Sequence, residues 1–184
     1  MSDPEAALVV RWKGGDTEAF NALVTVYEPR LIAYLGGWVA DRGTREDLFQ
    51  ETFLRVFSER DTLDPKAPFA FHVMRIARNL VIDRFRRQAA EKKASAAVGK
   101  LAPSPQPQPS AALALEERDG QVRAEVLALP TLQREALTLK LWGGLSWKEI
   151  GNLLDCSEDR AGRLGAQALA QLAFRLKDLG EAAS

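Results

Sequence analysis

Apolar side chains recur every three or four positions along most of the chain, which is the spacing of one face of an α-helix. The first clear run follows Asp16, a residue type that caps helices, and continues through Phe20 and Leu23. We expect this helix to break or bend near Pro29 and to stop around Gly36 and Gly37. Because no stretch alternates between apolar and polar residues for long, the pattern predicts an all-α protein.

The next predicted helix carries the segment EDLFQETFLRVF, with Thr44 as its candidate cap. Steps of about 100° per residue separate an apolar side from a largely acidic side. The apolar side holds Phe49, Thr52, Phe53 and Val56. The acidic side holds Asp47, Gln50, Glu51, Leu54 and Arg55. A solvated charged face is the simple interpretation, but a large apolar residue among carboxylates favours a partner surface.

A loop at residues 64–68 leads into a longer helix, predicted over about Phe69 to Gln88. Its core face is expected to hold Phe69, Val73, Ile76 and Leu80. The opposite arc is basic and carries rings, and it comprises Phe71, His72, Arg75, Arg78, Asn79, Ile82 and Arg86. Guanidinium groups pair with phosphates and flat rings stack on unpaired bases. The arc therefore favours a nucleic-acid surface, and a solvated basic face is the alternative.

A proline-rich segment, PSPQPQP at residues 103–109, divides the chain. Alternating prolines exclude helix and favour an extended path. We therefore predict two small helical domains, residues 16–93 and residues 120–178, joined by a flexible linker at residues 94–119. Each domain is expected to have its own core.

Residues typical of helix ends divide the second domain into short helices. They are Pro130 at a helix start, Gly143 with Gly144 at its end, Ser146 with Glu149 as a capping box, and Asp155 at a turn that needs a left-handed backbone. Small Gly151 is expected where two helices approach closely. Ser157 then caps a last helix through Leu164, Leu169 and Leu172. Two short helices joined by a tight turn predict a helix-turn-helix.

The exposed start of the last helix is the candidate reading head of this motif. We expect DNA contacts from Lys148, Ser157, Glu158, Arg160, Arg163 and Gln167. Gly162 and Gly165 are unusual inside a helix, where each costs about 1 kcal/mol relative to alanine. Small residues of this kind also permit close packing against another helix, in this protein or in a partner.

Charge changes this picture more through its distribution than through its sum. The 25 basic and 25 acidic residues cancel, but residues 41–64 hold seven acids and four basic residues, whereas residues 69–93 hold two acids and seven basic residues. Two oppositely charged surfaces in one domain predict two different partners.

Several classes of protein are disfavoured by what the sequence lacks. No apolar run is long enough for a membrane span, and the N-terminus is unlike a secretion signal, so we expect a cytoplasmic protein without membrane insertion. A single cysteine, Cys156, and a single histidine, His72, predict structural roles and no metal site. No nucleophile with a base and no phosphate loop is present, so we expect no enzyme activity, small-molecule substrate or cofactor.

The order of these motifs resembles that of a known protein family. EDLFQETFLRVF, PFAFHVMRIARNLVIDRFRR, the proline-rich segment and LPTLQREALTLKLWGGLSWKEIGNLLDCSEDRAGRL together resemble the extracytoplasmic-function (ECF) group of sigma-70 factors. The resemblance implies that the chain binds bacterial core RNA polymerase and promoter DNA and directs initiation, with an anti-sigma protein as a further candidate partner. The sequence departs from the family at His72, where tryptophan is usual, and in the last helix, which lacks the usual basic run.

Residue roles follow from the resemblance by position. It implies that Asp47, Gln50, Glu51, Leu54 and Arg55 bind core polymerase. It assigns the downstream promoter element and strand opening to the loop at residues 65–68, including Lys66, and to Phe71, Arg75, Arg78, Asn79, Asp83, Arg86 and Arg87. The helix-turn-helix is expected to read the upstream element. Two alternatives stay open: a free-standing helix-turn-helix regulator, and a sigma-like interaction protein with weakened DNA reading.

Overall fold

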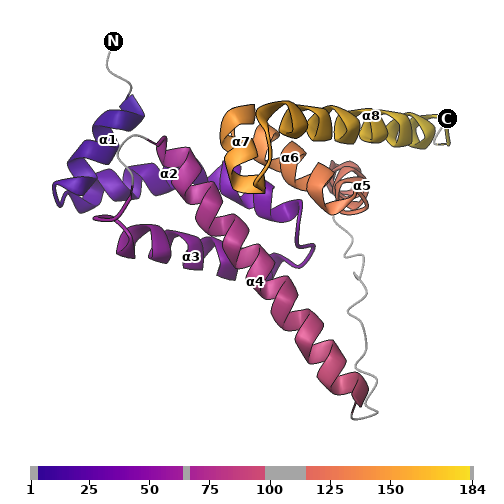
Figure 1. Cartoon of the computed structure of the whole chain (residues 1–184), viewed down its shortest axis with the longest axis horizontal. Coiled ribbons are helices and arrows are strands. Elements are labelled where there is room, and N and C mark those ends of the chain that lie inside the picture. Colours follow the sequence, from indigo (N-terminus) through magenta and orange to yellow (C-terminus); the bar gives the residue numbers. More distant parts are fainter. Residues whose placement is uncertain (1–3, 64–66, 98–114, 183–184) are drawn as a thin grey trace.

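In the computed structural model, residues 4–63, 67–97 and 115–182 are described, and all regular structure within them is helical (Figure 1). The helices are α1 (Pro4–Lys13), α2 (Thr17–Gly36), α3 (Arg42–Ser58), α4 (Phe69–Ala97), α5 (Leu115–Leu127), α6 (Thr131–Leu141), α7 (Trp147–Leu154) and α8 (Glu158–Ala182). We call α1–α4 the first half and α5–α8 the second half. The predicted all-α fold class is confirmed.

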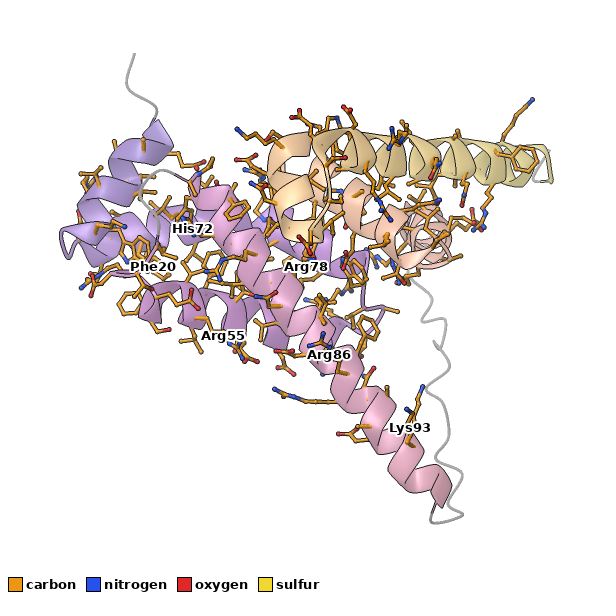
Figure 2. The ribbon with its side chains drawn as sticks, in the orientation of Figure 1. Phe20, Arg55, His72, Arg78, Arg86 and Lys93 are labelled. Atoms are coloured by element: carbon orange, nitrogen blue, oxygen red, sulfur yellow. The ribbon has the colours of Figure 1, made fainter. Side chains whose placement is uncertain are left out.

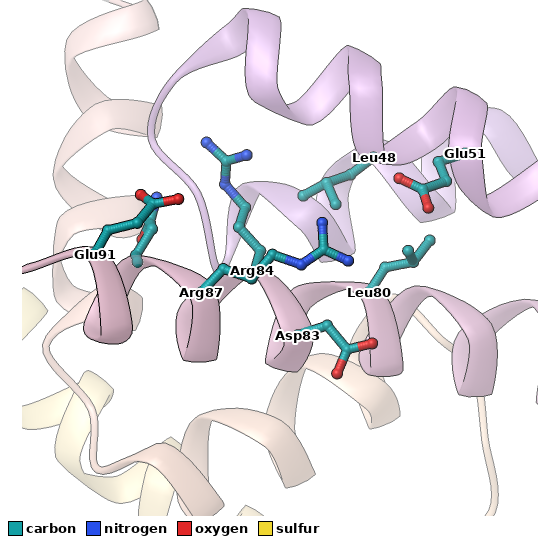
Figure 3. Close-up of a pocket in the computed structure, with 8 residues that line it drawn as sticks. Leu48, Glu51, Leu80, Asp83, Arg84, Arg87 and Glu91 are labelled. Carbon is teal, nitrogen blue, oxygen red and sulfur yellow. The ribbon is translucent and has the colours of Figure 1, made fainter. Parts of the chain in front are cut away.

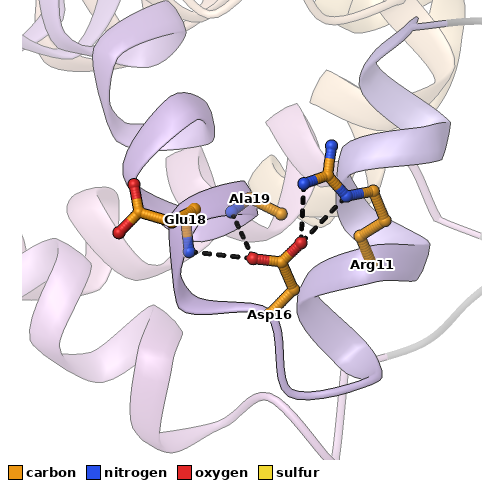
Figure 4. A network of polar contacts seen from close by, with 4 residues as sticks. All are labelled: Arg11, Asp16, Glu18 and Ala19. Atoms are coloured by element: carbon orange, nitrogen blue, oxygen red, sulfur yellow. Dashed lines mark hydrogen bonds and ion pairs between the residues drawn. The ribbon is translucent and has the colours of Figure 1, made fainter.

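Asp16 begins α2 as the sequence predicts. Its carboxylate accepts hydrogen bonds from the backbone N–H groups of Glu18 and Ala19 and from the guanidinium of Arg11 (Figure 4). The hydrogen bond from Arg11, and then those from the backbone, hold the pKa of Asp16 below its ordinary value. A charged cap therefore fixes the turn between α1 and α2.

Helix α1 is an element that the sequence reasoning missed. Its Trp12 is 1% exposed, and its ring centroid lies 5.0 Å from that of Phe20 and 5.7 Å from that of Phe69. Leu8 and Val9 pack against the same cluster. The helical spacing of Leu8, Val9 and Trp12 was the available signal. Helix α1 thus completes the aromatic core of the first half.

The helix cap predicted at Thr44 is wrong, and α2 does not break at Pro29. Helix α2 continues through Pro29, because Tyr27 and Leu31 on either side of it are fully buried and their packing outweighs the loss of one backbone hydrogen bond. Helix α3 is capped by Asp41, not by Thr44: the Asp41 carboxylate accepts the Thr44 backbone N–H at 2.7 Å. Thr44 itself lies in the first turn, where its hydroxyl accepts a hydrogen bond from Arg84.

The helix-turn-helix of the second half is present as predicted. The Ser146 hydroxyl accepts the Glu149 N–H, while the Glu149 carboxylate accepts the Ser146 N–H at 2.7 Å, which completes the capping box of α7. Asp155 ends α7 in the left-handed conformation, with φ 52° and ψ 50°. A Cβ on Gly151 would lie 2.7 Å from the Cys156 carbonyl oxygen, so the expected close approach is real.

Predicted apolar positions of α8 are buried unevenly. Leu172 is 7% exposed, whereas Leu169 is 55% exposed. Leu169 follows Ala168, which is fully buried, and one step along a helix turns a side chain by about 100°. Helix α8 packs on α5, α6 and α7 with one face, so its other faces stay exposed.

The core does not divide cleanly between the halves. Leu139, Leu145, Ile150 and Ala161 of the second half belong to the same buried cluster as the first-half core. A smaller, separate cluster lies within the second half and comprises Val126, Leu129, Leu137, Ala168 and Leu172. Each half thus has buried residues of its own, but part of the second half also packs into the core of the first.

The described residues bear on the predicted linker only at its two ends. Helix α4 continues to Ala97 and α5 begins at Leu115, so both enter the range predicted for the linker, and the proline-rich segment lies outside the described residues. The domain limits stay predictions.

Candidate polymerase and nucleic-acid interfaces

The acidic side of α3 is exposed as the sequence predicts. Leu54 is 70% exposed, and Asp47, Gln50 and Glu51 are also exposed. Arg55 donates to the Glu51 carboxylate at 2.6 Å across one helical turn, and Figure 2 shows it on α3, clear of the second-half helices. The opposite side of the helix is anchored by Leu48, Thr52, Phe53 and Val56, all of them buried. A rigid helix thus presents an apolar side chain among charges.

A hollow of about 280 Å³ lies where the acidic side of α3 meets α4 (Figure 3). It is lined by Leu48, Glu51, Leu80, Asp83, Arg84, Arg87, Gln88 and Glu91. Carboxylates and guanidinium groups therefore lie close together at the junction of the two predicted surfaces.

The basic arc of α4 is exposed toward its C-terminal end. Asn79, Arg86 and Arg87 are exposed, and the side chain of Arg86 is 79% exposed, with the Asp83 carboxylate 3.9 Å away. Figure 1 shows this end of α4 extending beyond the other first-half helices. These groups can meet a phosphate backbone without any change in the fold.

Two arginines of the same arc already have carboxylate partners. Arg75 donates to Glu59 at 2.8 Å, and Arg78 donates to Glu135 of α6 at 3.2 Å. Phe71 is half-buried, and Lys66 lies outside the described residues. The structure therefore brings only part of the predicted arc to the surface.

His72 is not part of the exposed arc. It is 6% exposed, with its ring centroid 6.0 Å from that of Phe71. Its assignment beside the basic residues is wrong because α4 packs against α1, α2 and α3, which widens its buried sector. Met74 and Ala77 are buried for the same reason.

The candidate reading head is open to solvent. Glu158, Asp159, Arg160, Arg163 and Gln167 are exposed at the start of α8, as are Ser157 just before it and Lys148 in α7. The Ser157 hydroxyl accepts the Arg160 backbone N–H at 3.3 Å, so the predicted cap is present. A hollow of about 290 Å³ is lined by Arg160, Arg163, Leu164 and Gln167. The first turns of α8 thus offer two guanidinium groups and an amide to a ligand.

Gly165 has an internal explanation. A Cβ on Gly165 would lie 2.3 Å from Cη2 of Trp147, whereas a Cβ on Gly162 would lie 3.9 Å from the same ring system. Gly165 therefore makes room for the tryptophan of α7 and does not need a partner protein to account for it. At Gly162 a Cβ would make only an ordinary contact with the ring.

Two family models match the chain: Sigma-70 region 2 over residues 23–91, and Sigma-70, region 4 over residues 119–172. The RNA polymerase sigma factor CarQ of Myxococcus xanthus is 32% identical over 155 residues, which cover 82% of this chain and 85% of CarQ. The chain belongs to the ECF group of the sigma-70 family. It is thus an RNA polymerase sigma factor that directs transcription initiation, as the resemblance implied.

Further relatives agree with this membership. The ECF sigma factor SigW of Bacillus subtilis is 29% identical over 152 residues, which cover 78% of this chain and 81% of SigW. CnrH, solved with the cytosolic domain of CnrY, has a TM-score of 0.71 at 23% identity and covers 96% of this chain and 99% of its own. RpoE of Bartonella quintana, solved with the anti-sigma factor NepR, has a TM-score of 0.70 at 22% identity and covers 86% of this chain and 96% of its own. These two structures share the fold of this sigma factor.

The region matches contain the candidate surfaces of the sigma factor. Region 2 spans all of α3 and most of α4, and region 4 spans α6, α7 and the start of α8. The family consists of transcription regulators that bind core RNA polymerase and promoter DNA. No helix in the described ranges is long and apolar enough to cross a membrane. Those ranges also hold no cluster of side chains suited to a metal ion.

Contacts between the halves of the sigma factor are the feature that sequence reasoning missed. They involve Arg30, Trp38 and Arg78 of the first half with Arg134, Glu135 and the carbonyls of residues 142–143 of the second. The bonded partners are 57 to 113 positions apart in the chain. No local motif signals such a pair.

Proposed function

We propose that the exposed side of α3 is where this sigma factor docks on core RNA polymerase. The observation that carries the proposal is Leu54, which is 70% exposed on a helix whose other side is firmly buried. An exposed leucine costs free energy in water, and contact with a partner surface recovers it. Asp47, Gln50, Glu51 and Arg55 around it would form the polar rim of the interface.

The proposal gives the basic end of α4 and the start of α8 to promoter DNA. Asn79, Arg86 and Arg87 would contact the downstream element, together with Phe71, Arg75, Arg78 and Lys66. Arg160, Arg163 and Gln167 would read base edges of the upstream element, with Lys148, Ser157 and Glu158 beside them. The proposed domains are residues 16–93 and residues 120–178, joined by residues 94–119. The chain itself carries out no chemistry in this proposal and acts in the cytoplasm with the polymerase.

An anti-sigma protein is a further proposed partner. RpoE, whose fold is similar, is bound to the anti-sigma factor NepR. A protein of that class would compete with polymerase for the surfaces named above.

Binding of purified core polymerase tests the docking surface. We expect Leu54→Ala and Glu51→Lys each to weaken binding by about tenfold or more, since losses above about 1.4 kcal/mol are typical of central interface residues. Val10→Ala is the matched control, because Val10 is 71% exposed on α1, outside both region matches. Initiation from genomic fragments should fall with core binding.

Equal binding by the parent, Leu54→Ala and Glu51→Lys would show that the α3 assignment is wrong. Specific binding of duplex DNA by the protein alone, with no effect of core enzyme, would instead support a free-standing regulator.

A further inference from the structure

Two arginines meet at the C-terminal end of α2, where the first turn of α3 and helix α5 lie beside it (Figure 1). A Cβ on Gly36, the last residue of α2, would lie 3.3 Å from Nη1 of Arg45 on α3 and 3.4 Å from Nε of Arg123 on α5. The two guanidinium groups therefore flank one small space, which Gly36 leaves open because it has no side chain. Like charges side by side repel, so the arrangement costs free energy unless an opposite charge compensates for it.

Neither arginine has a carboxylate partner in the part of the chain that the structure describes. Both guanidinium groups lack an ion pair and a hydrogen bond to any described residue. Nε of Arg45 is buried without a hydrogen-bond partner. Burial, and then the positive charges of Arg123 and Arg42, lower the pKa of Arg45. The surroundings of Arg45 thus disfavour its charge, and a bound anion would favour it.

The two carboxylates that act on Arg45 from nearby are engaged with other groups. Glu46 accepts a hydrogen bond from Arg42 at 2.8 Å, and Asp41 caps α3 by accepting the Thr44 N–H at 2.7 Å. Their charges therefore offset only part of the positive charge that gathers here.

The end of α2 also fails to account for the pair. The C-terminal end of a helix carries partial negative charge and favours cations nearby. The carbonyls of Ala33, Tyr34 and Leu35, however, already accept backbone N–H groups from the residues that follow α2. The helix end thus offers the two arginines a favourable field and no hydrogen bonds.

A hollow of about 200 Å³ opens at the same place. It is lined by Ala33, Gly36, Val122, Arg123 and Trp142. The guanidinium of Arg123 is its charged side, and the half-buried indole of Trp142 is the largest of its apolar walls. A ligand that combines an anionic group with a flat or apolar remainder matches such a lining.

We propose that Arg45 and Arg123 form a binding site for a small phosphate ester, with the phosphate between the two guanidinium groups beside Gly36 and the organic part of the ligand against Trp142. Phosphate oxygens accept guanidinium hydrogen bonds at about 2.8 Å, so one phosphate can bridge two groups that flank a space of this size. The bound phosphate would supply the opposite charge that the described residues do not. The site lies outside the surfaces assigned above to core polymerase and promoter DNA, so it adds a ligand to the proposed function and does not depend on it.

Three variants of the full-length chain change the site in different ways. Arg45→Gln and Arg123→Gln each remove one charge and keep a polar side chain. Gly36→Ala keeps both charges and places a methyl group in the space between them, at a residue without a positive φ. Arg175→Gln is the matched control, because it removes a half-buried arginine that has a carboxylate partner, Glu125 at 3.2 Å. Circular dichroism checks that all the proteins are folded.

Isothermal titration calorimetry at constant ionic strength measures the binding of three probes: inorganic phosphate, adenosine monophosphate and adenosine. We expect the parent to bind phosphate with a Kd of about 1 mM and adenosine monophosphate about tenfold more tightly, since a base stacked on an aromatic ring adds a factor of this order. Adenosine, which lacks the phosphate, should not bind at concentrations up to about 10 mM. Each site variant should weaken the binding of adenosine monophosphate by about tenfold or more, because it loses or blocks a charge-assisted hydrogen bond. Arg175→Gln should match the parent.

Three results would overturn the inference or a part of it. If neither phosphate nor adenosine monophosphate binds the parent at up to about 10 mM, the two arginines serve only to balance the end of α2. Unchanged binding in all three site variants would show that the ligand binds elsewhere. Equal affinities for phosphate and adenosine monophosphate would overturn the assignment of Trp142 to the ligand.

A nucleic-acid strand also carries phosphates, and a separate measurement distinguishes it from a small ligand. Fluorescence anisotropy gives the affinity for a labelled oligothymidine of about 16 nucleotides, enough for a single-strand site. We expect the site variants to bind it within about twofold of the parent. An equally large loss of oligothymidine affinity would assign Arg45 and Arg123 to the nucleic-acid surface and overturn the small-ligand inference.

Discussion

At the scale of single residues, Trp147 explains why α8 contains a glycine in its interior at Gly165. Two glycines inside α8 are costly in isolation, yet they lie beside a tryptophan from the preceding helix of the motif. The Lys140 amino group lies 5.1 Å from the centroid of the same ring, so the indole is held on more than one side. Gly165 is therefore part of the packing within the helix-turn-helix, whereas Gly162 leaves room for a methyl group.

The two glycines make a matched pair for a test. Gly165→Ala places a methyl group 2.3 Å from Trp147, so we expect it to lower the free energy of unfolding by about 1–3 kcal/mol, the range typical of overpacking. Gly162→Ala meets the ring only at 3.9 Å, and we expect it to be neutral or to stabilise by up to about 1 kcal/mol. Urea denaturation followed by tryptophan fluorescence measures both. Equal effects at the two positions would contradict the packing explanation.

At the scale of elements, α4 combines burial at its beginning with exposed charge toward its end. The sequence predicts both the helix and its core face, and Phe69, Val73, Ile76 and Leu80 are each buried to at least 96%. The breadth of the buried sector, which takes in His72, depends on three neighbouring helices. The exposed basic residues beyond that packed region are the ones to which we assign DNA contacts.

Salt dependence tests this division of α4. We expect the double variant Arg86→Ala, Arg87→Ala to bind oligothymidine more weakly and with a shallower dependence on salt, by about 0.7 in the logarithmic slope for each phosphate that is no longer neutralised. Arg42→Ala on α3 is the control, because that side chain is 85% exposed and equally charged. Anisotropy titrations at several salt concentrations give the slopes. The same slope in the double variant and the parent would remove these residues from the DNA surface.

At the scale of the whole molecule, the shared core couples the two halves. Leu139 is fully buried in the cluster that contains the first-half core, whereas Leu172 belongs to the separate cluster of the second half. The interface therefore combines an apolar part with the polar contacts of Arg30 and Arg78. A substitution that destabilises the apolar part should therefore loosen the packing of both halves.

Hydrogen exchange distinguishes the two clusters. We expect Leu139→Ala and Leu172→Ala each to cost about 2–5 kcal/mol, the range for truncating a buried leucine. Only Leu139→Ala should also speed amide exchange in α2, because it opens a cavity in the shared cluster. Exchange measured by mass spectrometry reports both halves in one experiment. Faster exchange in α2 from Leu172→Ala as well would mean that the clusters are not separate.

What the sequence determined by itself is the set of features whose partners lie within about one helical turn. The caps at Asp16 and Ser146, the left-handed turn at Asp155 and the apolar periodicity of the helices are all of this kind, and the structure contains each of them. Together with the motif order, they were sufficient to indicate the fold class and the family. Local interactions can be predicted from sequence because both partners lie close together in the chain.

What only the tertiary structure decided is which side chains meet across long stretches of chain. Pro29 stays helical because its neighbours are buried, His72 is enclosed by three helices, and Gly165 is matched to Trp147. Arg78 belongs to the predicted DNA surface by its position, but Glu135, 57 residues away, occupies it in the fold. Packing between helices determines which residues form such pairs. The apolar pattern along one helix determines only the face on which each residue lies.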